Sequence, residues 1–297
     1  MAYYAVPSSE SALIQRSSAE DLSVTFYAGE TAGDADGAVT IGVVDAEGST
    51  VVASGTATTS AGSGVYTYTL AAQTDLNDLT ATWSGTFGGN VMEFTTQHEI
   101  VGGFYASPSE IRAMDSINGE TTTFPLADLV KAITWSSEVI DNYVGASFVY
   151  RFHRDVLDGN NQTDIQLTHL FPQVIISGSI GGTALTATQI SNLNKYDSGV
   201  IRLKDDVWEF NNPGGGIKIN YEAGFSKTPP ADIAWAARTL ARYHLIEQVS
   251  RIPDRAISVQ SEFGNIQLAQ PGMNKPTPIP DVNVILNRHR HRPPVAF

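Results

Sequence analysis

The chain has 297 residues, of which 42% are hydrophobic and 16% are charged, with a net charge of −13 and no cysteine. This length predicts about two globular domains, and the lack of cysteine excludes disulfides and thiolate metal sites. Residues 1–103 hold one basic and twelve acidic residues, whereas residues 104–297 hold seventeen and nineteen, so two units with different surroundings are expected. Broad gripping of nucleic acid is not expected, because phosphate binding needs clustered Lys and Arg.

Residues 1–103 consist of seven short runs, many of which alternate apolar and polar residues, separated by turn residues. The alternation is strict in Val65–Leu70 and Thr80–Thr86. Such runs bury one face of a sheet, and their number and spacing are typical of an immunoglobulin-like β-sandwich. No residue marks a partner surface on it. The expected core aromatics are Phe26, Trp83 and Phe94, with Tyr66 or Tyr68.

Two helices are predicted next. Ser107 can cap the first, with Pro108 at its first position and Glu110 completing a capping box. The second begins at Phe124-Pro125 and ends near Gly145, a residue type that often follows a helix. Three-and-four spacing gives this helix one apolar face, made of Leu126, Leu129, Val130, Ile133, Ser137, Ile140, Tyr143 and Val144.

Residues 155–250 predict a second β region and a third helix. The strands are expected at Asp164–Thr168, Gln173–Ser179, Val200–Leu203 and Ile217–Glu222. The helix runs from Ala231 to about Val249, with His244 on its apolar stripe and expected in the core rather than as a ligand. Arg238 and Arg242 lie one turn apart on another face, where they are either solvated, salt-bridged, or in contact with an acidic neighbour.

Residues 251–297 are expected to form an extended C-terminal arm. Two strand-like pieces, Ile257–Gln260 and Asn265–Ala269, precede a segment with four prolines in residues 271–280, which excludes helix and central strand there. Asp281–Leu286 fits one more short helix or strand. Because the segment buries too little apolar surface to fold alone, it either lies on its own domain or orders on a partner.

Motifs for catalysis or cofactor binding are absent from the sequence. It contains no His-Glu-x-x-His, no Gly-x-Ser-x-Gly and no Walker loop. The turn at Asp158–Asn161 lacks the spacing of a calcium loop, and the glycines of Pro213–Gly216 lack the Lys-Ser/Thr of a phosphate loop. We therefore expect no enzyme activity, no metal and no cofactor. The first ten residues do not resemble a secretory signal, and no apolar run suits a membrane span.

Two stretches carry a resemblance to a known family: Tyr105–Ile111, with the sequence YASPSEI, and Ala132–Gly145, with the sequence AITWSSEVIDNYVG. A strand with Arg151 or Arg154 follows, and later Tyr221–Phe225 precedes Pro229-Pro230 and a helix. On these residues, about half of the chain, residues 104–250, resembles the head–tail adaptor (connector) proteins of tailed bacteriophages. The motifs are patterns of residue class.

The resemblance implies an α+β adaptor domain at 104–250. With the strand pattern of residues 1–103 and the composition of residues 251–297, we expect a multidomain protein with an immunoglobulin-like all-β sandwich at 1–103, outside the family pattern, and an extended arm at 251–297. The adaptor domain would combine a helical bundle with a β region. The implied role is structural: a ring of twelve copies in the neck of the virion, assembled in the host cytoplasm. The implied partners are other copies of the chain, the portal, a neck stopper or tail terminator protein, and genome DNA that passes through without sequence-specific binding.

Portal contacts are expected from the arm, at Ile257, Val259, Ile266, Leu268, Arg288, His289, Arg290, His291 and Arg292. Contacts between copies in the ring are expected at Arg238, Arg242, Glu138 and Asp141. The alternative is a binding or adhesion module of a phage or cell-surface protein, in which the β-sandwich of residues 1–103 holds a receptor or a glycan.

Overall fold

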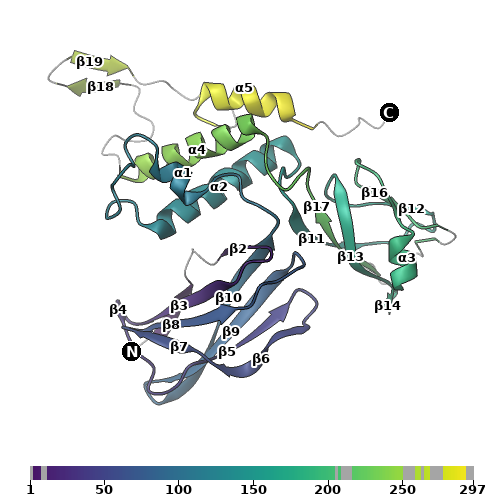
Figure 1. Ribbon diagram of the computed structural model, residues 1–297, viewed down its shortest axis with the longest axis horizontal. Coiled ribbons are helices and arrows are strands. Elements are labelled where there is room, and N and C mark those ends of the chain that lie inside the picture. Colours follow the sequence, from purple (N-terminus) through teal and green to yellow (C-terminus); the bar gives the residue numbers. More distant parts are fainter. Residues whose placement is uncertain are drawn as a thin grey trace. The chain divides into compact units, whose positions relative to one another are not determined.

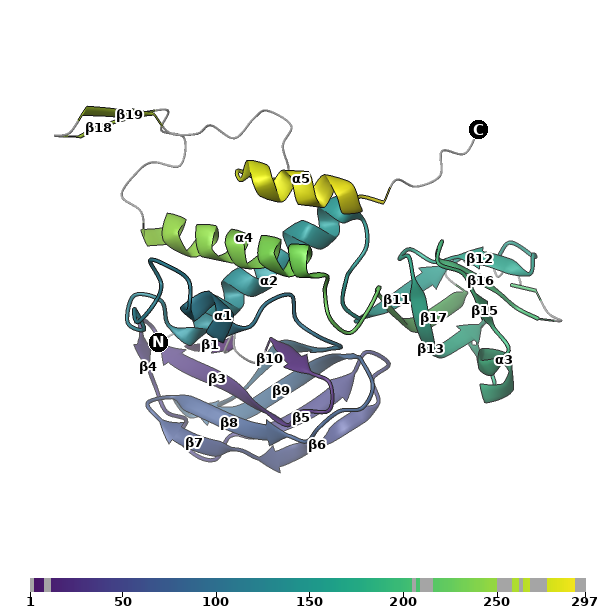
Figure 2. The ribbon, with the colours of Figure 1, turned by 45° about the horizontal axis from the view of Figure 1, so that its top comes forward.

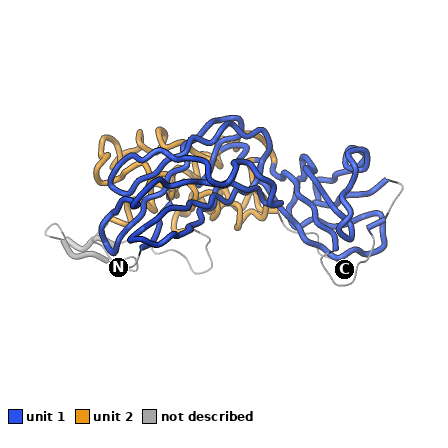
Figure 3. The backbone as a smooth tube through the Cα atoms, turned by 90° about the horizontal axis from the view of Figure 1, so that it is seen from below, with its two compact units in different colours: residues 1–103, 150–224 blue, residues 104–149, 225–297 orange. Residues whose placement is uncertain are grey.

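The computed structural model describes residues 3–7, 12–204, 207–208, 216–249, 258–261, 264–267 and 277–291. The chain forms two compact units, and each combines two separate stretches of sequence (Figure 3). Unit 1 contains residues 1–103 and 150–224, and unit 2 contains residues 104–149 and 225–297. The predicted domain at 104–250 is therefore not one compact unit, because its β region clusters with the N-terminal residues.

The first part of unit 1 consists of two five-stranded sheets, which we call the N-terminal sheet pair (Figures 1 and 2). One sheet has the order β1 (Tyr3–Pro7), β3 (Glu20–Ala28), β8 (Val65–Leu70) and β7 (Thr59–Gly62), with β4 (Thr31–Ala32) beside β3. The other has the order β2 (Leu13–Gln15), β10 (Asn90–Val101), β9 (Asp78–Phe87), β5 (Thr40–Asp45) and β6 (Thr50–Ala57). All pairs are antiparallel except β2 with β10.

Aromatic side chains fill the core that these two sheets share. Trp83 is fully buried, and its indole N–H donates to the Thr96 hydroxyl at 3.0 Å, so the polar atom of a large apolar side chain is satisfied. Phe26 packs with its ring centroid 5.6 Å from Tyr66 and 5.1 Å from Phe94. The core aromatics predicted from alternation are thus confirmed, with Phe94 partly rather than fully buried.

The second part of unit 1 contains two smaller sheets and a short helix. The larger sheet has the order β11 (Arg151–Leu157), β17 (Ile217–Ala223), β13 (Pro172–Ile180) and β14 (Thr183–Ala184). The smaller has the order β12 (Asp164–Gln166), β16 (Val200–Arg202) and β15 (Asn194–Lys195). The sequence predicted the main strands but not α3 (Ala187–Ser191), which Thr186 caps together with Gln189. Their common core includes Trp208 and Tyr221, both fully buried.

Polar contacts join the two parts of unit 1. Arg16 Nη2 lies 2.5 Å from Glu222 Oε2, and Arg151 Nε lies 3.2 Å from Glu99 Oε1. Phe152 of β11 is buried in the core of the N-terminal sheet pair. The β region therefore belongs to unit 1 because it shares both apolar burial and ion pairs with residues 1–103.

Unit 2 is built from helices α1 (Pro108–Arg112), α2 (Leu126–Val144), α4 (Ala231–Val249) and α5 (Pro280–His289). The predicted capping box is present at Ser107 and Glu110, and α2 ends at Gly145, whose φ of 82° suits glycine. Most of the predicted apolar face of α2 is buried, including Ile140. The prediction is wrong for Leu126, whose side chain is 45% exposed because it is the first residue of the helix.

The prediction of an extended arm over 251–297 is wrong for residues 277–291. Val282 and Leu286 of α5 are fully buried in one core with residues of α2 and α4. Burying such side chains contributes about 1.5–3 kcal/mol each, so this helix is part of the folded unit. Pro280 occupies the first turn of α5, where its missing N–H costs nothing. Before α5 in the chain, β18 (Ser258–Ser261) and β19 (Gly264–Gln267) form a hairpin that overlaps the two predicted strands.

Candidate functional site

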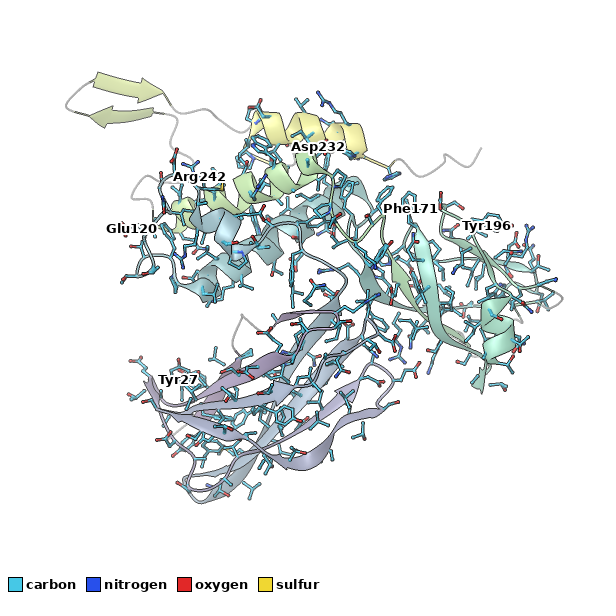
Figure 4. All side chains as sticks on the ribbon, in the orientation of Figure 1. Tyr27, Glu120, Phe171, Tyr196, Asp232 and Arg242 are labelled. Atoms are coloured by element: carbon cyan, nitrogen blue, oxygen red, sulfur yellow. The ribbon has the colours of Figure 1, made fainter. Side chains whose placement is uncertain are left out.

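The two arginines predicted to contact a neighbouring copy hold the start of unit 2 together. Arg238 Nη1 lies 2.9 Å from Glu110 Oε1. Arg242, labelled in Figure 4, donates from Nε to the Asp115 carbonyl at 2.9 Å and from Nη2 to the Ser116 hydroxyl at 3.4 Å. The salt-bridged alternative thus describes Arg238. Any contact of these arginines with another copy stays a prediction.

The first turn of α1 supplies the negative partner of this contact. The Ser107 backbone N–H has the largest effect on the pKa of Glu110 and lowers it. Burial raises the pKa, but the Ser107 hydroxyl and the Arg238 guanidinium lower it further, so the pKa is lowered overall. Glu110 is therefore ionised at neutral pH. The capping box that the sequence predicted as a local signal also orients a carboxylate towards α4.

Asp141 and Glu138, the acidic candidates on α2, have different surroundings. The Tyr105 hydroxyl donates a short hydrogen bond to the Asp141 carboxylate and accepts the Phe148 N–H at 2.6 Å. Burial, followed by the charge and hydrogen bond of Asp141, raises the pKa of Tyr105 far above its usual value, so the tyrosine remains a neutral donor. Asp141 thereby ties the end of α2 to the preceding chain, whereas Glu138 is exposed. Sequence analysis missed the contact between Tyr105 and Asp141, because a polar pair 36 residues apart leaves no local pattern.

Two of the basic residues predicted for the arm, His289 and His291, are bonded within unit 2. His289 Nε2 lies 2.8 Å from the carboxylate of Asp232, which is labelled in Figure 4 at the start of α4. Burial acts against ionisation of Asp232, but the hydrogen bond and charge of His289 and backbone N–H groups lower its pKa overall. The His291 N–H donates to the Val144 carbonyl at 2.9 Å. Arg288 and Arg290 are exposed, and Arg292 lies outside the described residues.

The apolar candidates for portal binding fall on the β18–β19 hairpin or beside it. Val259 pairs with Ile266 in the antiparallel register, whereas Ile257 and Leu268 lie outside the described residues. Among the strands that the structure describes, β18 and β19 pair only with each other. A lone two-stranded hairpin is marginally stable in water. A partner surface would therefore add stability to it.

Unit 1 contains a buried polar cluster that sequence analysis did not find. The rings of His153 and His169 stack with centroids 3.6 Å apart. The Tyr221 hydroxyl donates to Asp155 Oδ2 at 2.9 Å, and the Thr168 N–H donates to the same oxygen at 2.7 Å. Alternation along β11 could have placed His153 and Asp155 on one face, but only the β11–β17 register sets His153 opposite Tyr221.

The electrostatics of this cluster indicate a structural role. Burial, then the neighbouring His169 and Arg151, lower the pKa of His153 to about 3. Burial also lowers the pKa of His169, although Asp155 opposes the change. Both rings are therefore neutral at pH 7. Within the described ranges, no group of three or more His, Cys, Asp or Glu residues is arranged to hold a metal ion. No helix in the described part of the chain is long and apolar enough to cross a membrane.

Comparison with known proteins decides the family. Residues 106–261, more than half of the chain, match the family described as head completion protein. The chain belongs to this family. The match confirms the resemblance to phage head–tail adaptors predicted from Tyr105–Ile111 and Ala132–Gly145, and it gives the chain a structural role at the phage head–tail region. The matched residues include strands of unit 1 and helices of unit 2, whereas residues 1–103 precede them.

Two solved structures show distant likenesses to the chain. The chain is similar to a chain from the neck of an empty GTA particle computed with C6 symmetry, with a TM-score of 0.42, 16% identity, and coverage of 62% of this chain and 88% of that one. It is also similar to a DUF4785 family protein from Legionella pneumophila, with a TM-score of 0.24, 12% identity, and coverage of 33% and 27%. None of the curated proteins compared matches the chain.

Proposed function

We propose that this head completion protein forms a homo-oligomeric ring at the neck of the virion. The ring docks on the portal, and DNA passes through it towards the tail. The family match over residues 106–261 carries this proposal, and twelve copies is the number that the adaptor resemblance implies. A neck stopper or tail terminator protein then contacts the opposite side of the ring, assembly takes place in the host cytoplasm, and the role is structural rather than enzymatic.

The β18–β19 hairpin is the proposed portal contact. Its ladder is short and has no further strand beside it in the described part of the chain, so docking would satisfy edge groups that water otherwise solvates. Of the residues predicted for this contact, Val259 and Ile266 form a directly opposed pair. The hairpin lies in the sequence between α4 and α5, and both helices contribute to the core of unit 2. It is therefore a loop tethered at both ends rather than a free tail.

Residues 1–103 are proposed to be an immunoglobulin-like sandwich on the ring. Named in immunoglobulin order, the strands of one sheet read A-B-E-D and those of the other A′-G-F-C-C′, which is the strand arrangement of that architecture. The chain has no cysteine for the usual inter-sheet disulfide. The two sheets share an apolar core around Phe26 and Trp83.

A second function for the sandwich is binding of a receptor or glycan. Two observations favour it: residues 1–103 lie outside the family match, and Tyr4, which is 43% exposed, stacks on Tyr27 at 5.2 Å. Aromatic faces of this kind bind apolar surfaces of ligands. Particles carrying Tyr4→Ser with Tyr27→Ser should then adsorb to cells less well than the parent. Equal adsorption of the variant and parent particles would refute this second function.

Electron microscopy of the full chain mixed with its portal tests the proposed ring. The expected result is a closed ring on the portal, and a chain that stays monomeric beside its portal would refute the proposal. For the hairpin, Val259→Asp with Ile266→Asp is compared with Ser258→Asp with Gln267→Asp. Neighbouring pairs in a ladder belong to opposite faces, so the control carries equal charge on the other face. Only the first variant should lose portal binding by sedimentation.

A further inference from the structure

The two units differ in charge, and this difference bears on where DNA can pass. Unit 1 holds seven basic and twenty acidic residues, whereas unit 2 holds eleven of each. The whole net charge of −13 therefore belongs to unit 1. A duplex with closely spaced phosphates is repelled by an acidic surface and is attracted only where Lys or Arg side chains are available. Unit 2, which carries no net charge, is therefore repelled less by DNA than unit 1 is.

Within unit 2, basic residues gather at the end of α5, which we call the α5 basic end: Arg288, His289, Arg290 and His291. Its arginines are exposed, and neither forms an ion pair with an acidic residue in the described part of the chain. The basic side chains of α4, by contrast, are committed within the unit, Arg238 to Glu110 and Arg242 to the Asp115 carbonyl. The arginines at the α5 basic end are thus available to an external anion.

The α5 basic end is also held in place. His289 is bound to Asp232 at 2.8 Å, and the His291 N–H to the Val144 carbonyl at 2.9 Å. The Arg290 guanidinium carbon lies 5.0 Å from the ring centroid of Tyr143, whose hydroxyl donates to Asn287 at 2.5 Å. A segment fixed by these contacts loses little conformational freedom when it meets a ligand.

Neither the helix dipole nor a flexible arm accounts for the whole of this arrangement. Basic residues in a last helical turn complement the helix dipole, which suits Arg288 but not Arg290, because α5 ends at His289. A flexible arm reaching for the portal does not fit either, since the residues around both arginines are bonded to α2 and α4. Arginine is suited to phosphate because its planar group presents paired donors.

We propose that Arg288 and Arg290 contact the phosphate backbone of duplex DNA, without reading its sequence. This proposal rests on the proposed role of the ring as a DNA conduit, and it names the surface that contacts the duplex. Two phosphate contacts per chain are weak singly and fall in strength with salt. Repeated around a ring, they centre the duplex without stopping its movement.

The test measures binding of the full chain to a short DNA duplex by fluorescence anisotropy at several salt concentrations. With two phosphate contacts, affinity should fall about tenfold between about 50 and 200 mM salt. Arg288→Gln with Arg290→Gln should lose most of this salt dependence, whereas Arg288→Lys with Arg290→Lys should keep it. Lys218→Gln with Lys227→Gln is the matched control, because both lysines are exposed and the same two charges are removed.

The outcomes separate this proposal from the proposed function. A glutamine variant that keeps the salt dependence overturns it, and so does an equal loss in the lysine control, which would reflect net charge alone. A glutamine variant that fails to join the portal while DNA binding is unchanged assigns the surface to the portal and also overturns it. Rings on the portal in micrographs test the proposed function separately, and they can form whether or not DNA binding changes.

Discussion

The ion pair between Arg16 and Glu222 provides a direct test of how unit 1 is held together. Only 5% of the Glu222 side chain is exposed, against 25% of the Arg16 side chain. The Nε and Nη2 atoms of Arg16 have no well-aligned hydrogen-bond acceptor among the described residues, so the contact is mainly charge pairing. Arg16→Gln would leave a buried carboxylate without its counter-charge.

Removing one partner of a buried pair costs about 3–5 kcal/mol. Because Arg16 is a quarter exposed, water can partly replace it at the vacated position, and we expect Arg16→Gln to lower the stability of unit 1 by about 2–3 kcal/mol. At a urea m-value of about 2 kcal/mol/M, the midpoint should fall by about 1–1.5 M. Glu222→Gln should cost less, because the arginine left behind can reach solvent.

Tryptophan fluorescence can follow the two units separately. Trp83 and Trp208 belong to unit 1, and Trp135 and Trp235 belong to unit 2. Replacing Trp135 and Trp235 by Phe leaves a signal from unit 1 alone. The midpoint of urea unfolding is then compared between the parent and the variants in this background.

Arg202→Gln is the matched control, since it removes the same charge from the exposed pair with Asp164 in the same unit. Its midpoint should stay close to that of the parent, because water solvates the freed carboxylate. If Arg16→Gln is no more destabilising than Arg202→Gln, the contact does not help to join the two parts of unit 1, and the prediction is refuted.

Three further predictions concern single side chains. Between pH 6.5 and about 3 the unfolded chain binds a proton that folded His153 excludes. As the pH falls through this range, the free energy of unfolding should therefore decrease by up to about 1.4 kcal/mol per pH unit. His153→Asn should reduce this slope in urea titrations, and an unchanged slope would contradict the prediction. Leu286→Ala should destabilise unit 2 by about 2–5 kcal/mol in thermal unfolding, whereas the same effect from the exposed Val284→Ala would count against specific packing. Asn283→Ala removes the acceptor of the Thr277 N–H at 3.0 Å, so hydrogen exchange at that amide should become faster. Unaltered exchange would show that this hydrogen bond does not protect the amide.

Local patterns in the sequence predicted much of this molecule. The capping box at Ser107 and Glu110, the glycine end of α2 at Gly145 and the strand alternation in Val65–Leu70 all appear in the structure. Each depends on neighbours within a few residues, so the sequence is enough to predict it. The two stretches that resemble adaptor proteins also pointed to the family that the match over 106–261 establishes.

Contacts between distant parts of the chain were beyond the reach of such patterns. The proline-rich composition before α5 suggested an open arm, yet Val282 and Leu286 are buried because α2 and α4 leave an apolar surface for them. Likewise, no local pattern predicted that Tyr105 binds Asp141 inside the unit, and a ring contact of Asp141 stays a prediction. Composition reports how much apolar surface a segment carries, but not which surface it meets.

Residue patterns alone were enough to predict the local elements, the charge imbalance between residues 1–103 and the rest, and the class of protein. The folded chain was needed to show that residues 150–224 join the N-terminal sheet pair, that the hairpin is tethered at both ends, and that the α5 basic end is held on unit 2. This division arises because propensity and periodicity act over a few residues. Ion pairs and shared cores, in contrast, depend on which distant surfaces come together.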